Sequence, residues 1–101
     1  MARFLVTGAL PYSNGRLHVG HIAGAYLPAD IYTRYLRSAG HEVRFICGSD
    51  DNGVAALNSA RNEERPVEEL TADYRKRQHK AFEFLGIHFD LYGGTHSFEP
   101  V

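Results

Sequence analysis

Two histidines three residues apart, His18 and His21, are the side chains in this sequence best suited to chemistry. They follow a turn, "PYSNGR", and stand where a helix is expected to begin. Side chains at this spacing share one face of a helix, and the helix start adds unpaired N–H groups that favour phosphate. Imidazole N–H groups can donate to phosphoryl oxygens, and these bonds strengthen as charge develops in a transition state. The pattern therefore indicates phosphate binding.

Two other interpretations of the histidines stay open. Taken alone, an H-x-x-H pattern is more often a pair of surface histidines. It could also be half of a metal site, but the other ligands are not obvious in the sequence. Because Cys47 is the only cysteine, a Cys-cluster zinc site is excluded within this chain, and Cys47 is expected to be a small buried side chain. Metal binding is therefore the weaker hypothesis.

A second candidate site is the pair of adjacent carboxylates Asp50 and Asp51 in "GSDDNG". At the end of a strand, such a pair could bind a cation, an ammonium group or a ribose hydroxyl. The alternative is that Ser49, Asp50 or Asp51 caps the helix expected to begin near Asn52. A third possibility is that one carboxylate caps this helix while the other binds a ligand.

The elements around these loops alternate between strand and helix. Strands are expected at residues 3–9, 42–47 and 88–93, a helix at 19–39 with a kink at Pro28, and a short helix from Asn52. Pro66 is expected in the first turn of a last helix, which runs to about Leu85. Its buried face is expected to hold Val67, Leu70, Tyr74, Ala81 and Leu85. This order predicts an α/β fold of parallel strands with crossover helices, whose ligands collect at the carboxyl ends of the strands.

Length and charge limit the possible functions. A chain of 101 residues forms at most one domain, and its net charge of −1 argues against a broad nucleic-acid-binding surface. If RNA is a partner, most of its binding surface is expected elsewhere. The apolar run at the N-terminus is too short for a secretory signal, and none approaches the length of a membrane span. The expected location is the cytoplasm, with no membrane partner.

Together, the two loops resemble a known family. "TGALPYSNGRLHVGH", followed by "FICGSDDNG", is similar to the start of the methionyl-tRNA synthetases, which are class I aminoacyl-tRNA synthetases. "HVGH" resembles their HIGH signature. The resemblance implies a partial Rossmann-type (HUP-like) nucleotide-binding fold, with residues 1–101 as the amino-terminal part of the catalytic domain. Asp51 and Asn52 depart from the family pattern, in which Glu, and His or Tyr, are common.

The resemblance also implies a role for each matching residue. His18 and His21 would be the catalytic pair on the ATP phosphates, and Gly20 would let adenine approach the backbone. Asp50 would receive the substrate ammonium group. The remaining residues lie in the signature loop: Pro11, Asn14 and Gly15 on the side of ATP, and Leu10 and Tyr12 in the methionine pocket.

The implied reaction is ATP-dependent activation of methionine, with Mg²⁺, followed by transfer of methionyl to tRNA(Met). The implied partners are methionine, the remainder of the catalytic domain, and tRNA(Met) through regions absent from this chain. No KMSKS-like loop is present, so the isolated chain is expected to be incomplete for catalysis. Two alternatives are a non-catalytic fragment that binds ATP or methionine and a small nucleotidyltransferase of the HxGH type.

Overall fold

The fold is built on three parallel strands. A computed structural model describes residues 1–95, in which β1 (Arg3–Thr7), β2 (Glu42–Ser49) and β3 (Leu91–Gly94) lie side by side in the order β1-β2-β3. Arg3 pairs with Glu42, and Ile46 pairs with Leu91. The predicted α/β class with parallel strands and crossover helices is therefore confirmed. The last residues of the expected domain, 96–101, lie outside the described residues.

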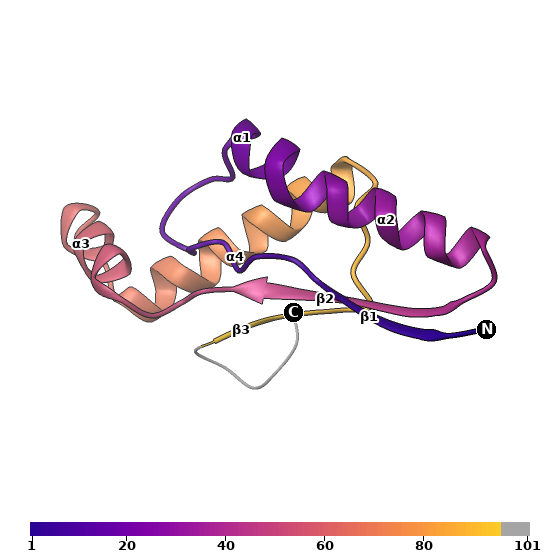
Figure 1. Cartoon of the computed structure of the whole chain (residues 1–101). Coiled ribbons are helices and arrows are strands. Elements are labelled where there is room, and N and C mark those ends of the chain that lie inside the picture. The colour runs from indigo at the N-terminus through magenta and orange to yellow at the C-terminus, as the bar shows by residue number, and fades with distance from the viewer. Residues whose placement is uncertain (96–101) are drawn as a thin grey trace.

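The helices connect successive strands. They are α1 (Val19–His21), η1 (Ile22–Tyr26), α2 (Leu27–Ser38), α3 (Val54–Asn62) and α4 (Val67–Phe84). In Figure 1, α2 and α4 lie on the same face of the sheet, and α3 lies beyond the carboxyl end of β2. Both loops with candidate chemistry begin at that end.

The helix after the first loop changes its hydrogen-bond register before Pro28. A kink at Pro28 was the expectation, whereas the structure has a π-helical segment, Ile22–Tyr26, followed by regular helix from Leu27. The N–H of Leu27 donates to the carbonyl of Ile22, five residues back. Pro28 has no N–H to donate, so the regular series of hydrogen bonds to the carbonyl four residues back is interrupted there. The turn before it has hydrogen bonds to the carbonyl five residues back. The irregularity therefore lies on the side of the candidate loop.

The start and buried face of α4 also differ from the prediction. Pro66 is the N-cap residue, so the first helical residue is Val67. The buried residues of α4 are Leu70, Thr71, Gln78 and Phe82, of which only Leu70 was predicted. The two polar side chains, Thr71 and Gln78, donate hydrogen bonds to backbone carbonyls, which a pattern based on hydrophobicity does not detect.

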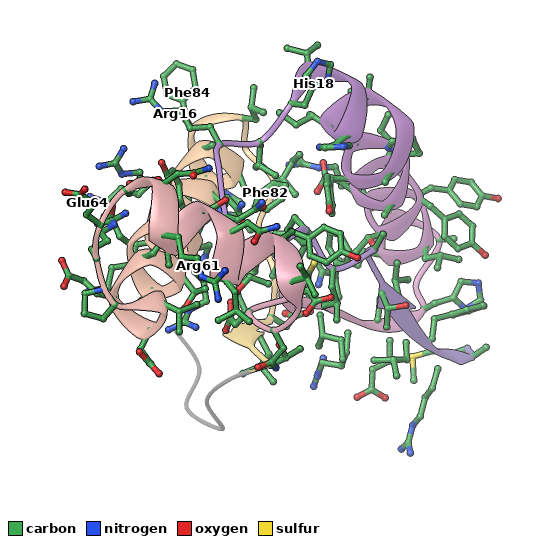
Figure 2. The ribbon with its side chains drawn as sticks, turned by 90° about the vertical axis from the view of Figure 1, so that its left-hand side faces the viewer. Arg16, His18, Arg61, Glu64, Phe82 and Phe84 are labelled. Carbon is green, nitrogen blue, oxygen red and sulfur yellow. The ribbon has the colours of Figure 1, made fainter. Side chains whose placement is uncertain are left out.

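The core lies between the sheet and the helices. Its buried residues are Tyr26, Phe45, Phe82, Ile87 and Tyr92. Tyr26 and Phe82 meet edge to face, with ring centroids 4.8 Å apart. In Figure 2, Phe82 lies in the interior, whereas Phe84 points outward at the end of α4.

The other face of the sheet has no helix against it in the described part of the chain (Figure 1). Side chains alternate along a strand, so Leu5 and Leu91 point away from the core residues Phe45 and Tyr92. Leu5 is 66% exposed and Leu91 is 49% exposed. This face therefore presents apolar side chains to solvent. Because of this uncovered face, we expect the isolated chain to be poorly stable.

Candidate functional site

The two candidate loops are joined by backbone hydrogen bonds. The N–H of Asp50 donates to the carbonyl of Pro11 at 2.7 Å, and the N–H of Ser13 donates to the carbonyl of Asp50 at 3.1 Å. Tyr12 and Asp50 thereby form a short parallel bridge beyond the ends of β1 and β2. The loops thus lie against each other at the carboxyl edge of the sheet, although 37 positions separate Ser13 from Asp50.

The first loop, together with α1, η1 and α4, encloses a pocket of about 290 Å³. Tyr26 and Gln78 contribute to its wall. Six of the predicted site residues also line it, namely Leu10, Pro11, Tyr12, Asn14, Gly15 and His21. Three predicted residues, His18, Gly20 and Asp50, are not part of this lining. The structure therefore brings most of the predicted set around one cavity and leaves the rest beside it.

His18 is the N-cap residue of the helix that begins at Val19. Its Nδ1 accepts a hydrogen bond from the N–H of Gly20 at 2.9 Å. An accepting Nδ1 carries no proton, so a neutral ring has its N–H on Nε2, where it can donate to a ligand. The His18 and His21 rings are 5.6 Å apart at an angle of 64°, and both side chains are exposed. Two imidazole donors therefore stand together at the end of the pocket that His21 lines.

The Gly20 position is tight because of His18. A Cβ there would lie 3.1 Å from His18 Nδ1, so a larger residue would disturb the capping ring. This contact is a structural reason for glycine. The implied role of Gly20, approach of adenine to the backbone, stays a prediction.

Asp50 and Asp51 differ sharply in environment. The Asp50 carboxylate accepts from the N–H of Asn52 at 3.2 Å and is partly exposed. Neither carboxylate caps the next helix, because the N-cap of α3 is Gly53, with φ of 112° and no side-chain cap. The helix-cap interpretation of "SDD" is therefore wrong, and Asp50 is the carboxylate available to a ligand.

Asp51 is a buried structural residue. Its side chain is 0% exposed and pairs with Arg75 of α4, with Nη1 and Oδ2 2.7 Å apart. The hydroxyls of Ser13 and Ser49 donate to its other oxygen at 2.6 and 2.5 Å. Because charged groups make the stronger hydrogen bonds, this network fixes the first loop, the end of β2 and α4 to one another.

Gln78 is a site residue that the sequence analysis missed. It is 2% exposed, and its Nε2 donates to the backbone carbonyls of Tyr12 and Gly15, both at 2.8 Å. It therefore holds both ends of the turn that lines the pocket. In the sequence, Gln78 lies in "YRKRQHK", and a charged run of this kind is typical of a solvated helix face. The sequence feature that indicates burial of Gln78 is its position four residues before Phe82, since residues four apart share one face of a helix.

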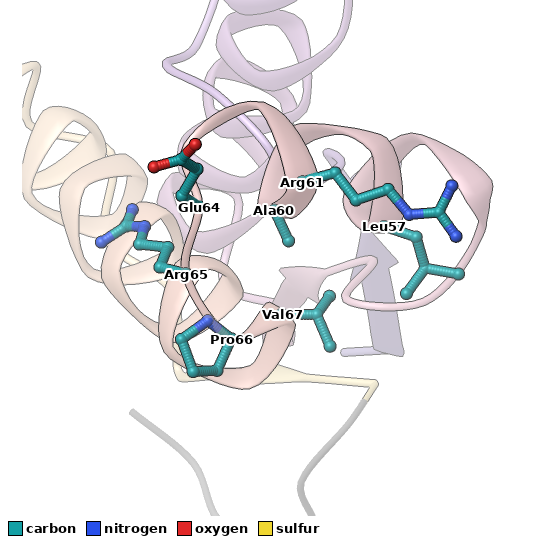
Figure 3. Close-up of a pocket in the computed structure, with 7 residues that line it drawn as sticks. All are labelled: Leu57, Ala60, Arg61, Glu64, Arg65, Pro66 and Val67. Atoms are coloured by element: carbon teal, nitrogen blue, oxygen red, sulfur yellow. The ribbon is translucent and has the colours of Figure 1, made fainter.

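A second hollow lies between α3 and α4, away from the predicted residues. It measures about 470 Å³, and Figure 3 shows Arg61, Glu64 and Arg65 at its rim above apolar side chains. Arg65 forms ion pairs with Glu63 at 3.3 Å and Asp73 at 3.2 Å, so its charge is already matched. Nothing in this hollow indicates a reaction.

Two groups near the site are held in their neutral forms: Tyr26, which is buried, and Cys47, which is only partly buried and not fully buried as expected. Burial raises the pKa of Cys47 to about 11, so its thiol is not a reactive nucleophile at neutral pH. Burial also raises the pKa of Tyr26 to about 12, and its hydroxyl donates to the carbonyl of Ala9 at 2.6 Å. Within residues 1–95, no group of three or more His, Cys, Asp or Glu side chains is arranged to hold a metal ion. No helix in that range is both long and apolar enough to cross a membrane.

Comparison with known proteins identifies the family. The model of the class I tRNA synthetases (M) matches residues 4–100. This chain belongs to that family. The methionine–tRNA ligase of Salinibacter ruber is 53% identical over 95 residues, which cover 94% of this chain and 13% of that protein. The methionine–tRNA ligase of Pyrococcus furiosus is 48% identical, with the same coverage.

A solved structure supports the same assignment. The methionyl-tRNA synthetase of Mycobacterium tuberculosis, in complex with methionyl-adenylate, superposes with a TM-score of 0.92 at 30% identity. The match covers 97% of this chain and 19% of that one. The fold is therefore the Rossmann-like fold of class I synthetase catalytic domains, as the family resemblance implied. The chain spans about an eighth of the length of the curated relatives, at 13%.

Proposed function

We propose that this chain forms part of a methionine–tRNA ligase, which activates methionine with ATP to methionyl-adenylate and transfers methionyl to tRNA(Met). The observation that carries the proposal is the pocket at the carboxyl edge of the sheet, where His21 and five residues of the signature loop meet. Ligands of parallel α/β folds bind at this edge. The curated relatives named above bear the same activity in their names.

In this proposal, His18 and His21 bind the phosphates of ATP. The Nε2 donor of His18 and the neighbouring His21 ring would stabilise charge that develops on the α-phosphate as the methionine carboxylate attacks. Pro11, Asn14, Gly15 and Gly20 would shape the ATP side of the site. Mg²⁺ would arrive bound to ATP as part of the substrate. No covalent nucleophile is needed, because the protein contributes positioning and electrostatic stabilisation.

The amino acid would lie on the other side of the signature loop. Leu10 and Tyr12 would contact methionine, and Asp50 would accept the substrate ammonium group in a charge-assisted hydrogen bond. The exposure of Asp50 supports this role, since Asp51 is already bound to Arg75 and two hydroxyls. The remainder of the catalytic domain, tRNA(Met) through regions absent from this chain and a cytoplasmic location belong to the same proposal.

The test compares three variants in the complete protein. Asp50→Ala should mainly weaken methionine binding, since loss of one partner of a desolvated charge pair costs about 2–5 kcal/mol. His18→Ala and His21→Ala should instead lower the activation rate, by about 2.7–4 kcal/mol in barrier, with methionine affinity retained. Methionine titrations and ATP–pyrophosphate exchange measure the two effects. Unchanged methionine affinity in Asp50→Ala would contradict the assignment of Asp50.

A second candidate function applies to the chain alone. It would bind ATP or methionine weakly without turnover, because no lysine-bearing KMSKS-like loop is present in the sequence. ATP–pyrophosphate exchange by the chain alone, and after addition of the remaining catalytic domain, separates binding from catalysis. Exchange by the chain alone would contradict the binding-only function.

A further inference from the structure

Asparagine followed directly by glycine occurs twice in this chain, once in each candidate loop. Asn14–Gly15 lines the candidate pocket, and Asn52–Gly53 joins the end of the second loop to α3. Such a pair can react within the chain, because glycine has no Cβ to hinder the approach of its own amide nitrogen to the asparagine side chain. Whether it reacts in the folded chain depends on how firmly the surrounding structure holds it.

Asn52–Gly53 is open to solvent, and both of its residues are exposed. A Cβ at Gly53 would have no neighbour within 4 Å apart from the adjoining residues, so there is free space around the reacting atoms. Within residues 1–95 the Gly53 N–H donates to no acceptor, so this nitrogen has no hydrogen bond to lose. The Asn52 amide donates from Nδ2 to Thr95 Oγ1 at 3.1 Å, and this hydrogen bond is itself exposed.

The backbone that follows Asn52 is weakly held. The N-cap of α3 is Gly53, with φ of 112° and no side-chain cap, and the first helical residue, Val54, is 71% exposed. The hydrogen bond from the N–H of Leu57 to the carbonyl of Gly53 is long, at 3.4 Å. A helix start without a side-chain cap opens at little cost, so the backbone at Gly53 can reach the geometry that ring closure requires.

Asn14–Gly15 is the same dipeptide in a restrained turn. Both residues are partly buried, and Asn14 Nδ2 donates to Ser59 Oγ at 3.4 Å. Gln78 Nε2 donates to the carbonyls of Tyr12 and Gly15, both at 2.8 Å, and so holds the backbone on either side of Asn14. These hydrogen bonds must break before the turn can rearrange. The two pairs therefore have the same chemistry and different restraints.

We infer that Asn52–Gly53 is a site of spontaneous deamidation in the folded chain. The Gly53 nitrogen loses its proton to solvent and attacks Cγ of Asn52, so that a new C–N bond forms. The bond from Cγ to Nδ2 breaks, and this nitrogen takes a proton from water and leaves as ammonia. Water then opens the resulting cyclic imide at either carbonyl, which yields aspartate or isoaspartate. The only co-reactant is water.

The products change the candidate site in two ways. Each places a third carboxylate directly after Asp50 and Asp51 and removes the Nδ2 donor to Thr95. Isoaspartate also adds a methylene group to the backbone before α3. That the added charge alters binding of a substrate ammonium group at Asp50 rests on the proposed function. The modification itself depends only on the residues described.

The test follows both asparagines in the 101-residue chain at mildly alkaline pH, with trimethylamine oxide to favour the folded state. Trypsin then separates the two pairs into peptides 4–16 and 45–61. Mass spectrometry detects replacement of the side-chain NH₂ by OH at each asparagine and distinguishes isoaspartate from aspartate. Asn52 should be modified about fivefold faster than Asn14 or more, because Asn14 must first lose its restraint from Gln78. In urea, where neither loop is held, the two rates should agree.

Two variants serve as controls. Asn52→His removes the reacting amide, so modification at this position should disappear while the rate at Asn14 stays as in wild type. Gln78→Leu frees the turn around Asn14, so the rate at Asn14 should rise toward that at Asn52. Circular dichroism of each protein before and after incubation excludes unfolding as the cause.

Each possible outcome supports or overturns the inference. Faster modification of Asn52 in the folded chain, equal rates in urea and isoaspartate among the products support it. Equal rates in the folded chain, or a faster reaction at Asn14, overturn it. Aspartate without isoaspartate would show direct hydrolysis of the side-chain amide and overturn the route through the cyclic imide. None of these measurements depends on ATP–pyrophosphate exchange, so the proposed function can fail or hold independently.

Discussion

The Asp51–Arg75 ion pair offers the sharpest test of how the site is held together. Asp51→Asn keeps the size of the side chain but removes its charge, and leaves Arg75, whose side chain is 13% exposed, without its partner. It also replaces one carboxylate oxygen by an NH₂ group in a place where Ser13, Ser49 and Arg75 all donate. Donors would then face donors in a buried space.

Although Asp51→Asn exchanges a single heavy atom, the expected loss in the free energy of unfolding is large. Removal of one partner from a buried ion pair typically costs about 3–5 kcal/mol, because the other charge stays buried and unpaired. A whole domain is stable by only about 5–15 kcal/mol, so this change should remove a large fraction of the stability of the chain. Simultaneous Arg75→Gln removes the stranded charge. The double variant should therefore be more stable than the sum of the two single losses predicts, by about 0.5–3 kcal/mol.

Urea unfolding followed by circular dichroism provides the assay, with trimethylamine oxide added where a variant is too unstable to give a folded baseline. Asp73→Asn is the matched control: Asp73 also pairs with an arginine, Arg65 at 3.2 Å, but its side chain is 35% exposed. It should change stability far less than Asp51→Asn. Equal effects of the two substitutions, or strictly additive losses in the double variant, would refute the argument that burial of the pair is decisive.

Three further predictions concern the site and the sheet. Gln78→Leu removes two hydrogen bonds at 2.8 Å and should cost about 1–3 kcal/mol, with faster hydrogen exchange at Ser13; unchanged exchange would contradict the role of Gln78 in holding the loop. Gly48→Ala places a Cβ 2.7 Å from the carbonyl oxygen of Gly93 and should lower the free energy of unfolding in urea by about 1–3 kcal/mol. The control is Gly24→Ala, whose Cβ would have no neighbour within 4 Å beyond the backbone of its own helix and which should not destabilise the chain. Because the pKa of Cys47 is raised from 9.0 to about 11, the fold favours the neutral thiol, so the free energy of unfolding should hold below pH 9 and fall as the pH rises toward 11. Cys47→Ala should flatten that fall, and an unchanged slope would assign it to other groups.

The parallel sheet could be predicted because its signal is local. Each strand is a short apolar run, each is followed by a helical pattern, and alternation of this kind has essentially one architecture. The pocket loop could be predicted for the same reason, since Pro11, Asn14 and Gly15 indicate a turn from their own chemistry. What these patterns cannot give is the partner of a polar side chain.

The difference between Asp50 and Asp51 shows that limit. In the sequence, they are two equivalent carboxylates beside each other. Side chains alternate between the two faces of an extended chain. Ser49 and Asp51 therefore lie on the same side, toward α4, where they are hydrogen-bonded to each other, and Asp50 lies on the opposite side. That argument requires knowing that extended backbone continues past Cys47, where the expected strand ended. Gln78 was missed for a related reason, because its partner Tyr12 is 66 positions away.

The parallel register of the sheet also constrains the order in which this chain can acquire structure. Arg3 must find Glu42, and Ile46 must find Leu91, so neither strand pair can close as a hairpin between neighbouring residues. Contacts so distant along the chain are entropically slow to form, whereas α2 and α4 need only local ones. Helices should therefore appear before the sheet during refolding. Until β2 has emerged and paired, β1 is an exposed apolar strand, and association with other chains is the hazard that competes with folding.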